Sequence, residues 1–150
     1  MLFRRITQVL LAVYLLILGL VSLWPKPVDG GGFIWFLTSQ VLQFTRGVSW
    51  LNWLQYNQLE AIANGLLYLP LGVFLVILLP KLKVWWLLPI PVLVSALAEA
   101  IQRFFLPSRY STLDDVYHNA LGGVIGVLIS VSIRRLKRLS ARGHSTSPVE

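Results

Sequence analysis

Four long apolar runs dominate the chain and restrict it to a membrane-spanning fold. They cover residues 6–23, 59–79, 84–106 and 113–133, and most charged residues lie between or beyond them. Because a helix rises about 1.5 Å per residue, each run is long enough to cross about 30 Å of hydrocarbon. Backbone polar groups in lipid must be paired within their own segment, so helices are the expected form. The sequence therefore predicts an all-α, polytopic membrane protein with four transmembrane helices.

The composition favours a bilayer as the solvent and excludes several other classes. Hydrophobic residues make up 56% of the 150 residues, charged residues make up only 13%, and the mean hydropathy is +0.71. A water-soluble domain of ordinary composition is far more polar. The net charge of +7 lies near the ends of the runs rather than on a folded surface, so no nucleic-acid partner is expected. The absence of cysteine rules out disulfides and thiolate metal sites.

The first run is typical of a retained helix rather than of a cleaved signal peptide. Arg4 and Arg5 precede it, and its apolar core exceeds the usual signal-peptide length. After it comes an interfacial segment, residues 26–58, whose aromatic side chains partition to lipid headgroups. We expect this segment to lie on the membrane as a short amphipathic helix or loop. Its aromatic residues are Phe33, Trp35, Phe36, Phe44, Trp50, Trp53 and Tyr56.

Three parts of the chain follow from these runs, and their charges indicate an orientation. Residues 1–58 hold the first transmembrane helix and the interfacial segment, and residues 59–133 form a three-helix membrane core. Residues 134–150 are expected to form a basic, disordered tail. Basic residues near spans are retained in the cytoplasm, so both termini are expected there. Nine of the thirteen basic residues fall on that side, namely Arg4, Arg5, Lys81, Lys83, Arg134, Arg135, Lys137, Arg138 and Arg142.

Polar residues of the last three spans are predicted to share one depth in the membrane. The second and fourth spans begin at the face where the third span ends, so their polar positions fall at the same level. Ionisable groups within a membrane normally face the bundle interior and pair there. We therefore expect one hydrogen-bonded cluster beneath the outer headgroups. Its members are Glu60, Asn64, Glu99, Gln102, Arg103, Asp114, Asp115, His118 and Asn119, with Arg109 in the loop before the last span.

Helical spacing indicates which of these residues face the bundle interior, because positions three and four apart share a helix face. All three polar faces end in small residues, which permit close helix approach and predict a packed three-helix core. Pro70 is expected to bend the second helix, and the first helix, without internal charge, to lie at the periphery. The faces comprise Glu60, Asn64, Tyr68 and Gly72; Ser95, Glu99, Gln102 and Arg103; and Asp115, Asn119, Gly122 and Gly126.

Structural roles compete with functional ones for several of these residues. Asp114 or Asp115 is placed to cap the first amides of the fourth span. Glu99 and Arg109 suit an ion pair between the last two spans, and the asparagines suit interhelical hydrogen bonds worth about 1 kcal/mol. His118 is the only histidine outside the tail and has no second histidine nearby to complete a metal site, so an interfacial position is expected. No catalytic triad or phosphate loop is present, which leaves both an enzyme and an inert packing cluster open.

The order and spacing of these residues resemble the VanZ-like family of bacterial membrane proteins. Three stretches carry the resemblance, which covers about residues 60–133: Asn64-Gly-Leu-Leu-Tyr-Leu-Pro70-Leu-Gly72, then Glu99-Ala-Ile-Gln102, then Arg109-x-x-x-x-Asp114-Asp115-x-x-x-Asn119-x-x-Gly122-Gly123. The resemblance implies a multi-pass protein of the bacterial cytoplasmic membrane. The founding case is linked to low-level teicoplanin resistance, and no enzymatic activity is established for the family.

The family pattern marks a functional set and the residues that support its packing. Thr112 stands where many relatives have an aspartate, and His118 stands where an aliphatic residue is usual. Both departures lower the local negative charge and bear on ligand specificity. The functional set is Asn64, Glu99, Gln102, Arg109, Asp115 and Asn119. The supporting residues are Pro70, Gly72, Gly122 and Gly123, to which capping and helical spacing add Asp114 and Gly126.

Three functions from different classes fit this set. In the first, the outer-face cluster engages a lipid-linked envelope glycan or a glycopeptide, and the protein confers low-level glycopeptide resistance. In the second, a membrane enzyme acts on a lipid headgroup or lipid-linked sugar, with Glu99 or Asp115 as general base and Arg109 binding phosphate. The third is a non-catalytic accessory subunit. No cofactor or metal is expected for any of them, and the lipid bilayer is a partner in all three.

Overall fold

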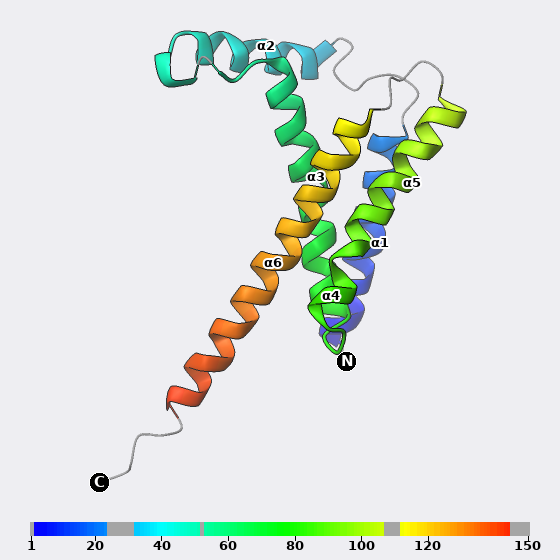
Figure 1. Ribbon diagram of the computed structural model, residues 1–150, viewed down its shortest axis with the longest axis vertical. Helices are drawn as coiled ribbons and strands as arrows, with labels where there is room; N and C mark the ends of the chain where they lie inside the picture. The colour runs from blue at the N-terminus through cyan, green and yellow to red at the C-terminus, as the bar shows by residue number, and fades with distance from the viewer. Residues whose placement is uncertain (1, 24–31, 52, 107–111, 145–150) are drawn as a thin grey trace.

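Long helices make up most of the computed structural model (Figure 1). The structure describes residues 2–23, 32–51, 53–106 and 112–144. These ranges contain helices and no strand, which confirms the predicted all-α fold. The helices are α1 (Leu2–Ser22), α2 (Gly32–Arg46), the short 3-10 helix η1 (Ser49–Leu51), α3 (Tyr56–Leu78), α4 (Val84–Leu87), α5 (Pro89–Phe105) and α6 (Leu113–His144).

Four stretches of the described chain are long and apolar enough to cross a membrane, as predicted. The third stretch combines α4 and α5, which are separated only at Leu88, where Pro89 begins α5. Proline is tolerated in the first helical turn, because its missing N–H would have no partner there. Pro70 lies inside α3, which continues as a helix beyond it. The stretches are Leu2–Ser22, Tyr56–Leu78, Val84–Phe105 and Leu113–Ala141.

Glycines bring α3 and α6 into close contact. A Cβ atom added to Gly72 would overlap the backbone of Gly123, and one added to Gly122 would overlap the backbone of Gly65. Close backbone approach of this kind supplies van der Waals contacts between helices, which are the main source of association where the solvent is lipid. The small residues of the two predicted faces therefore lie where these helices meet, and α5 packs on the same helix α6.

The first helix packs on α3 and α5, and most of its apolar side chains remain exposed. Leu18 of α1 joins Tyr68 and Leu71 of α3 in one hydrophobic cluster. The exposed apolar surface suits a helix whose surroundings are lipid tails. This position agrees with the peripheral place expected for a span without internal charge. A second cluster joins α3, α4 and α6 and consists of Val76, Leu87, Val127 and Val131.

The aromatic-rich segment forms α2 and η1, and α2 runs across the end of the bundle rather than along it (Figure 1). Phe36 and Phe44 of α2 are exposed, with 54% and 69% of their surfaces accessible. A helix that lies across the spans with exposed aromatic rings suits the headgroup region, where such rings partition. The sequence allows either a short amphipathic helix or a loop for this segment, and the structure shows a helix.

Helix α6 continues well beyond the predicted end of the last span. The sequence predicts a span ending at residue 133 and a disordered tail over residues 134–150, but the helix runs to His144. Arginine, leucine, lysine and alanine fill most of this stretch and are strong helix formers, and basic side chains are favoured near a helix C-terminus. The tail is therefore helical over residues 134–144, which corrects the prediction, and residues 145–150 lie outside the described residues.

Candidate functional site

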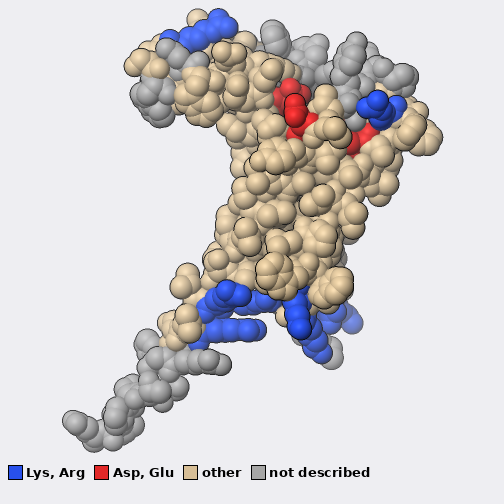
Figure 2. Space-filling model, viewed as in Figure 1, with Lys and Arg blue, Asp and Glu red and all other residues tan. Residues whose placement is uncertain are grey.

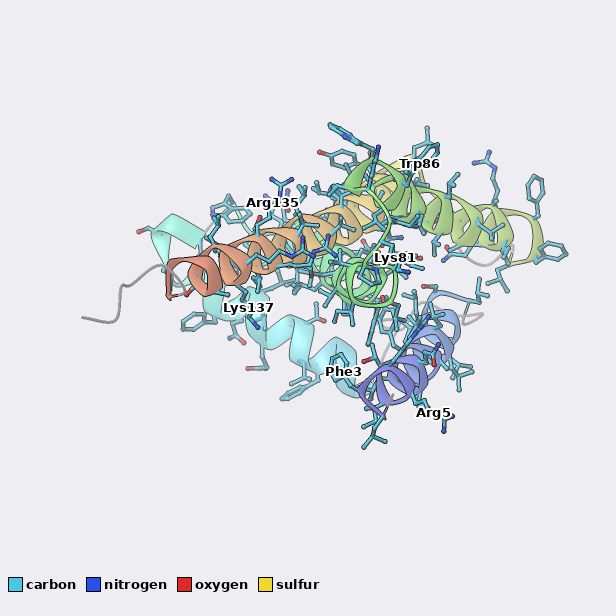
Figure 3. The ribbon with its side chains drawn as sticks, turned by 90° about the horizontal axis from the view of Figure 1, so that it is seen from below. Phe3, Arg5, Lys81, Trp86, Arg135 and Lys137 are labelled. Carbon is cyan, nitrogen blue, oxygen red and sulfur yellow. The ribbon has the colours of Figure 1, made fainter. Side chains whose placement is uncertain are left out.

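Acidic side chains gather at one end of the membrane-spanning helices and most basic side chains at the other, although the acidic end also carries basic side chains (Figure 2). All four acidic residues that the structure describes lie at one end, while a group of basic residues lies at the other, which Figure 3 views face-on. We define the polar end by Glu60, Asn64, Glu99, Gln102, Asp115 and Asn119. We define the basic end by Arg4, Arg5, Lys81, Lys83, Arg134 and Arg135.

Helix α5 buries a stripe of polar side chains that ends at the polar end. Ser95 is fully buried, and Glu99 and Gln102 are 5% and 7% exposed. Their spacing of four and three residues places them on one helix face. Arg103 was predicted to share this face, but its side chain is exposed. Its position near the end of α5 allows the guanidinium to reach polar surroundings, which costs less than burying the charge.

A hydrogen bond between Asn64 and Asp115 joins α3 to α6. Asn64 Nδ2 donates to Asp115 Oδ1 over 3.1 Å. Both side chains are half-buried. Asn64 directly precedes Gly65, and Asp115 lies about two turns before Gly122, where the two backbones nearly touch. A hydrogen bond to an ionised carboxylate is shorter and stronger than one between neutral groups. The structure therefore brings together two residues of the predicted functional set.

Thr112 holds the other oxygen of the same carboxylate. Its hydroxyl donates to Asp115 Oδ2 over 2.7 Å and accepts a hydrogen bond from the Asp115 backbone N–H over 3.1 Å. Because α6 begins at Leu113, Thr112 is the N-cap residue of this helix. The capping partner is thus Asp115, whereas Asp114 is exposed. Thr112 supplies the cap oxygen that an aspartate at this position would also supply, since both residue types are favoured N-caps.

Two hydrogen bonds to backbone carbonyls tie α5 to its neighbours. Gln102 Nε2 donates to the Ser22 carbonyl of α1 over 2.7 Å. Ser95 Oγ donates to the Val116 carbonyl of α6 over 3.1 Å. Glu99 lies between these two residues on the same face of α5. The two bonds therefore fix the position of the buried carboxylate relative to both α1 and α6.

Asn119 combines deep burial with an open hydrogen-bond acceptor. Its side chain is 5% exposed, and among the described residues no donor is bonded to its Oδ1 atom. A buried acceptor without a partner costs about 1–3 kcal/mol. Because nearly all buried polar groups in native proteins are paired, this oxygen marks a position suited to a donor from beyond the described residues.

Several residues outside the predicted functional set belong to the same region. Tyr68 is 1% exposed, forms a side-chain hydrogen bond with Ser22, and lies within electrostatic range of Glu99. The Tyr14 hydroxyl donates to the Leu67 carbonyl over 2.8 Å, which adds a second polar tie between α1 and α3. The sequence signal for these residues is a hydroxyl within an apolar run, because a buried hydroxyl needs a partner.

Other predicted residues lie at the margin of the cluster or beyond it. Glu60 is exposed, and His118 is half-buried with its ring edge against Tyr117, at a centroid distance of 5.4 Å. Arg109 lies outside the described residues, so its ion pair with Glu99 and its phosphate-binding role stay predictions. Within the described ranges, no three His, Cys, Asp or Glu side chains are grouped closely enough to hold a metal ion.

Fold and site together define a class of small polytopic helical membrane proteins, in which polar side chains converge at one end of a glycine-packed bundle. The family model described as VanZ/LLP1 matches residues 9–134. The chain therefore belongs to the VanZ/LLP1 family, and the match extends into α1, beyond the residues that carried the resemblance. Searches of curated proteins and of solved structures found no match.

Proposed function

We propose that the protein binds the headgroup of a lipid-linked envelope glycan at its polar end and thereby confers low-level glycopeptide resistance. The observation that carries this proposal is the buried Asn119 side chain, whose Oδ1 has no donor among the described residues. Membership of the VanZ/LLP1 family supports the proposal, because the founding case of the VanZ-like resemblance is linked to teicoplanin resistance. The two arguments are independent, since one rests on geometry and the other on the sequence match.

The chemistry of the described cluster favours a ligand with several hydrogen-bond donors. Glu99 and Asp115 contribute carboxylates, Gln102 and Asn119 contribute amide oxygens, and these groups accept hydrogen bonds. Sugar hydroxyls and peptide N–H groups are suitable donors. A headgroup that donates to these carboxylates gains charge-assisted hydrogen bonds, which are about twice as strong as neutral ones.

The position of the cluster favours a ligand that is anchored in the bilayer and reaches the site laterally. The polar residues lie at the ends of α3, α5 and α6, at the same end of the bundle as the aromatic helix α2. This level corresponds to the headgroup region, where the sugar of a lipid-linked glycan resides while its tail stays in the hydrocarbon. The excess of basic residues at the opposite end favours an external location for the polar end.

Binding is tested with purified full-length protein in lipid nanodiscs and a polyprenyl-diphosphate disaccharide as the probe. Asn119→Leu removes the open acceptor and keeps the number and branching of the side-chain heavy atoms. We expect this variant to bind about fivefold more weakly, the effect of losing one hydrogen bond of about 1 kcal/mol. The thermal stability of the variant should stay equal or rise, because a buried unpaired acceptor has been removed.

The matched control is Asn57→Leu, which makes the same exchange at an exposed position in the first turn of α3. It should bind the disaccharide lipid as the unaltered protein does. In a teicoplanin-susceptible bacterium, the unaltered protein and Asn57→Leu should raise the inhibitory concentration of teicoplanin at equal expression, and Asn119→Leu should not. Equal protection by both variants would contradict the assigned site.

The same preparation separates binding from catalysis. If the disaccharide lipid is converted to a new product, and Glu99→Gln abolishes the conversion while leaving the protein folded, the site belongs to an enzyme with Glu99 as base. If Asn119→Leu and Glu99→Gln both lose thermal stability and neither changes binding or teicoplanin susceptibility, the cluster only stabilises helix packing in an accessory subunit. Recovery of intact lipid with weakened binding only in Asn119→Leu supports the proposal.

A further inference from the structure

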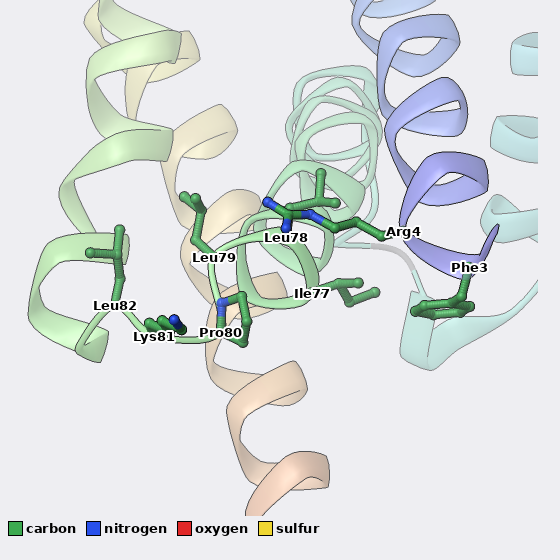
Figure 4. A pocket seen from close by; sticks show the side chains of 8 residues that line it. All are labelled: Phe3, Arg4, Ile77, Leu78, Leu79, Pro80, Lys81 and Leu82. Carbon is green, nitrogen blue, oxygen red and sulfur yellow. The ribbon is translucent and has the colours of Figure 1, made fainter. Parts of the chain in front are cut away.

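A pocket opens at the basic end, between the first turn of α1 and the end of α3 (Figure 4). Its volume is about 390 Å³, enough for a small polar headgroup. Phe3 and Arg4 come from α1, Ile77 from the last turn of α3, and Pro80 and Lys81 from the turn that follows. Arg4 extends from α1 toward Leu78 and forms one wall of the pocket (Figure 4).

The positive charges at this pocket lack acidic partners in the part of the chain that the structure describes. Every described aspartate and glutamate lies at the polar end, at the far end of the spans (Figure 2). Arg134 of α6 adds a third cation beside the pocket, since its Nη1 donates to the Pro80 carbonyl over 3.3 Å. The side chains at the turn after α3 therefore include three cations, Arg4, Lys81 and Arg134. An external anion would neutralise this positive charge.

The remaining walls of the pocket favour a lipid as the source of that anion. Phe3 is 73% exposed and Ile77 is 39% exposed, so the pocket continues into an exposed apolar surface. An ion dissolved in water gains nothing from such a surface, whereas the glycerol and acyl chains of a phospholipid bury apolar area on it. The first amide N–H groups of α1 lie at the same end and carry the positive end of the helix dipole.

From the pocket, the unmatched cations and the apolar rim, we propose that this pocket binds the phosphate of an anionic phospholipid between α1 and the turn after α3. Arg4 and Lys81 contact the phosphate, and Phe3 and Ile77 contact the upper acyl chain. The site is separate from the polar end and does not depend on the function proposed there. Binding at this position would fasten the N-terminal turn of α1 to α3 through the lipid.

The proposal is tested with full-length protein in phosphatidylcholine bilayers that contain a trace of spin-labelled lipid. The fraction of motionally restricted label reports association with the protein. Spin-labelled phosphatidylglycerol should associate more strongly than spin-labelled phosphatidylcholine. In Arg4→Gln with Lys81→Gln this preference should fall about fivefold per cation removed, the value expected for a basic residue near an anionic membrane surface.

Two further variants distinguish a pocket from diffuse surface charge. Arg135→Gln with Lys137→Gln removes the same charge from exposed positions on α6 that do not line the pocket, and it should retain most of the preference. Ile77→Trp keeps all charges but fills the pocket at a partly exposed position, and it should lose the preference. If both double variants lose the preference equally and Ile77→Trp retains it, the charge acts diffusely and the proposal is overturned.

Added inorganic phosphate distinguishes a lipid from a soluble ion as the occupant. Millimolar phosphate at constant ionic strength should leave the restricted fraction of phosphatidylglycerol unchanged, because the apolar contacts belong to the lipid alone. If phosphate displaces the labelled lipid fully at low millimolar concentration, the pocket is a site for a soluble phosphate, and the lipid assignment is overturned.

Discussion

Asn64 and Asp115 meet at the polar end because each stands on the inward face of its helix, and one hydrogen bond of 3.1 Å joins them. The bond connects α3 to α6 and is supported by Thr112, which holds the second carboxylate oxygen. Hydrogen bonds between transmembrane helices contribute modestly to stability, since the unfolded chain in the membrane also finds partners. The bond therefore acts mainly by fixing where the carboxylate lies.

A double-mutant cycle measures the strength of this contact. Asn64→Ala and Asp115→Ala should each lower the free energy of unfolding. The double variant should lose about 1 kcal/mol less than the sum of the two single losses. Unfolding in mixed micelles at increasing sodium dodecyl sulfate gives the four free energies. As a control, Asn57→Ala combined with Asp115→Ala should show strictly additive effects. A coupling energy of zero for the first pair would exclude a direct bond.

Two adjacent acidic residues at the start of α6 differ in their surroundings. Asp114 and Asp115 are adjacent acids, yet one is exposed and the other is bonded to Thr112 and Asn64. The difference follows from helix phase, because adjacent residues lie about 100° apart around the axis. The sequence predicts this separation for Asp115 through its spacing from Asn119, and the structure agrees.

At the scale of the helices, the contact between α3 and α6 depends on which glycines face the partner backbone. A Cβ on Gly122 would overlap the Gly65 backbone, whereas a Cβ on Gly65 would lie 3.5 Å from the His118 carbonyl oxygen, an ordinary contact distance. The same pair of residues therefore differs sharply in tolerance to a methyl group. The sequence predicts that Gly122 faces the partner helix, but it does not predict that Gly122 and Gly65 differ in tolerance. That difference depends on the relative tilt and offset of the two helices.

This asymmetry gives a matched pair of substitutions. Gly122→Ala should destabilise the protein by about 1–3 kcal/mol, the cost of forcing a methyl group into a packed contact. Gly65→Ala should change the free energy of unfolding by less than about 1 kcal/mol, because alanine fits there and favours the helix. Unfolding in mixed micelles measures both. Equal effects of the two substitutions would mean that α3 and α6 do not pack as described.

The end of helix α6 could not be predicted from hydropathy alone. Hydropathy ends at residue 133 because the following residues are basic, and basic polar stretches often lack structure. The helix continues to His144 because these residues also favour helix formation and suit its C-terminal end. Hydropathy therefore located the end of the apolar span, while helix propensity decided where the helix itself stops.

For the molecule as a whole, the separation of charge between the two ends predicts its orientation. Both termini and the turn after α3 should lie in the cytoplasm, because their basic residues resist translocation. A cytoplasm-active reporter fused after Lys83 or after Glu150 should be active, and a periplasm-active reporter at these positions should be silent. A fusion after Leu106 should give the reverse pattern. An external signal from either of the first two sites would invert the assignment and place the polar end inside.

The sequence by itself determined the four spans, the α-helical class, the polar level shared by three spans and the membership in a family. Each of these depends on local hydrophobicity or on helical spacing, which are properties of short segments. Tertiary structure alone decided that α1 supplies the Ser22 carbonyl to Gln102, that Tyr68 faces Ser22, and that Arg103 is exposed. These contacts depend on how far each helix is shifted and rotated against its neighbours, and that geometry is set by close packing between distant segments.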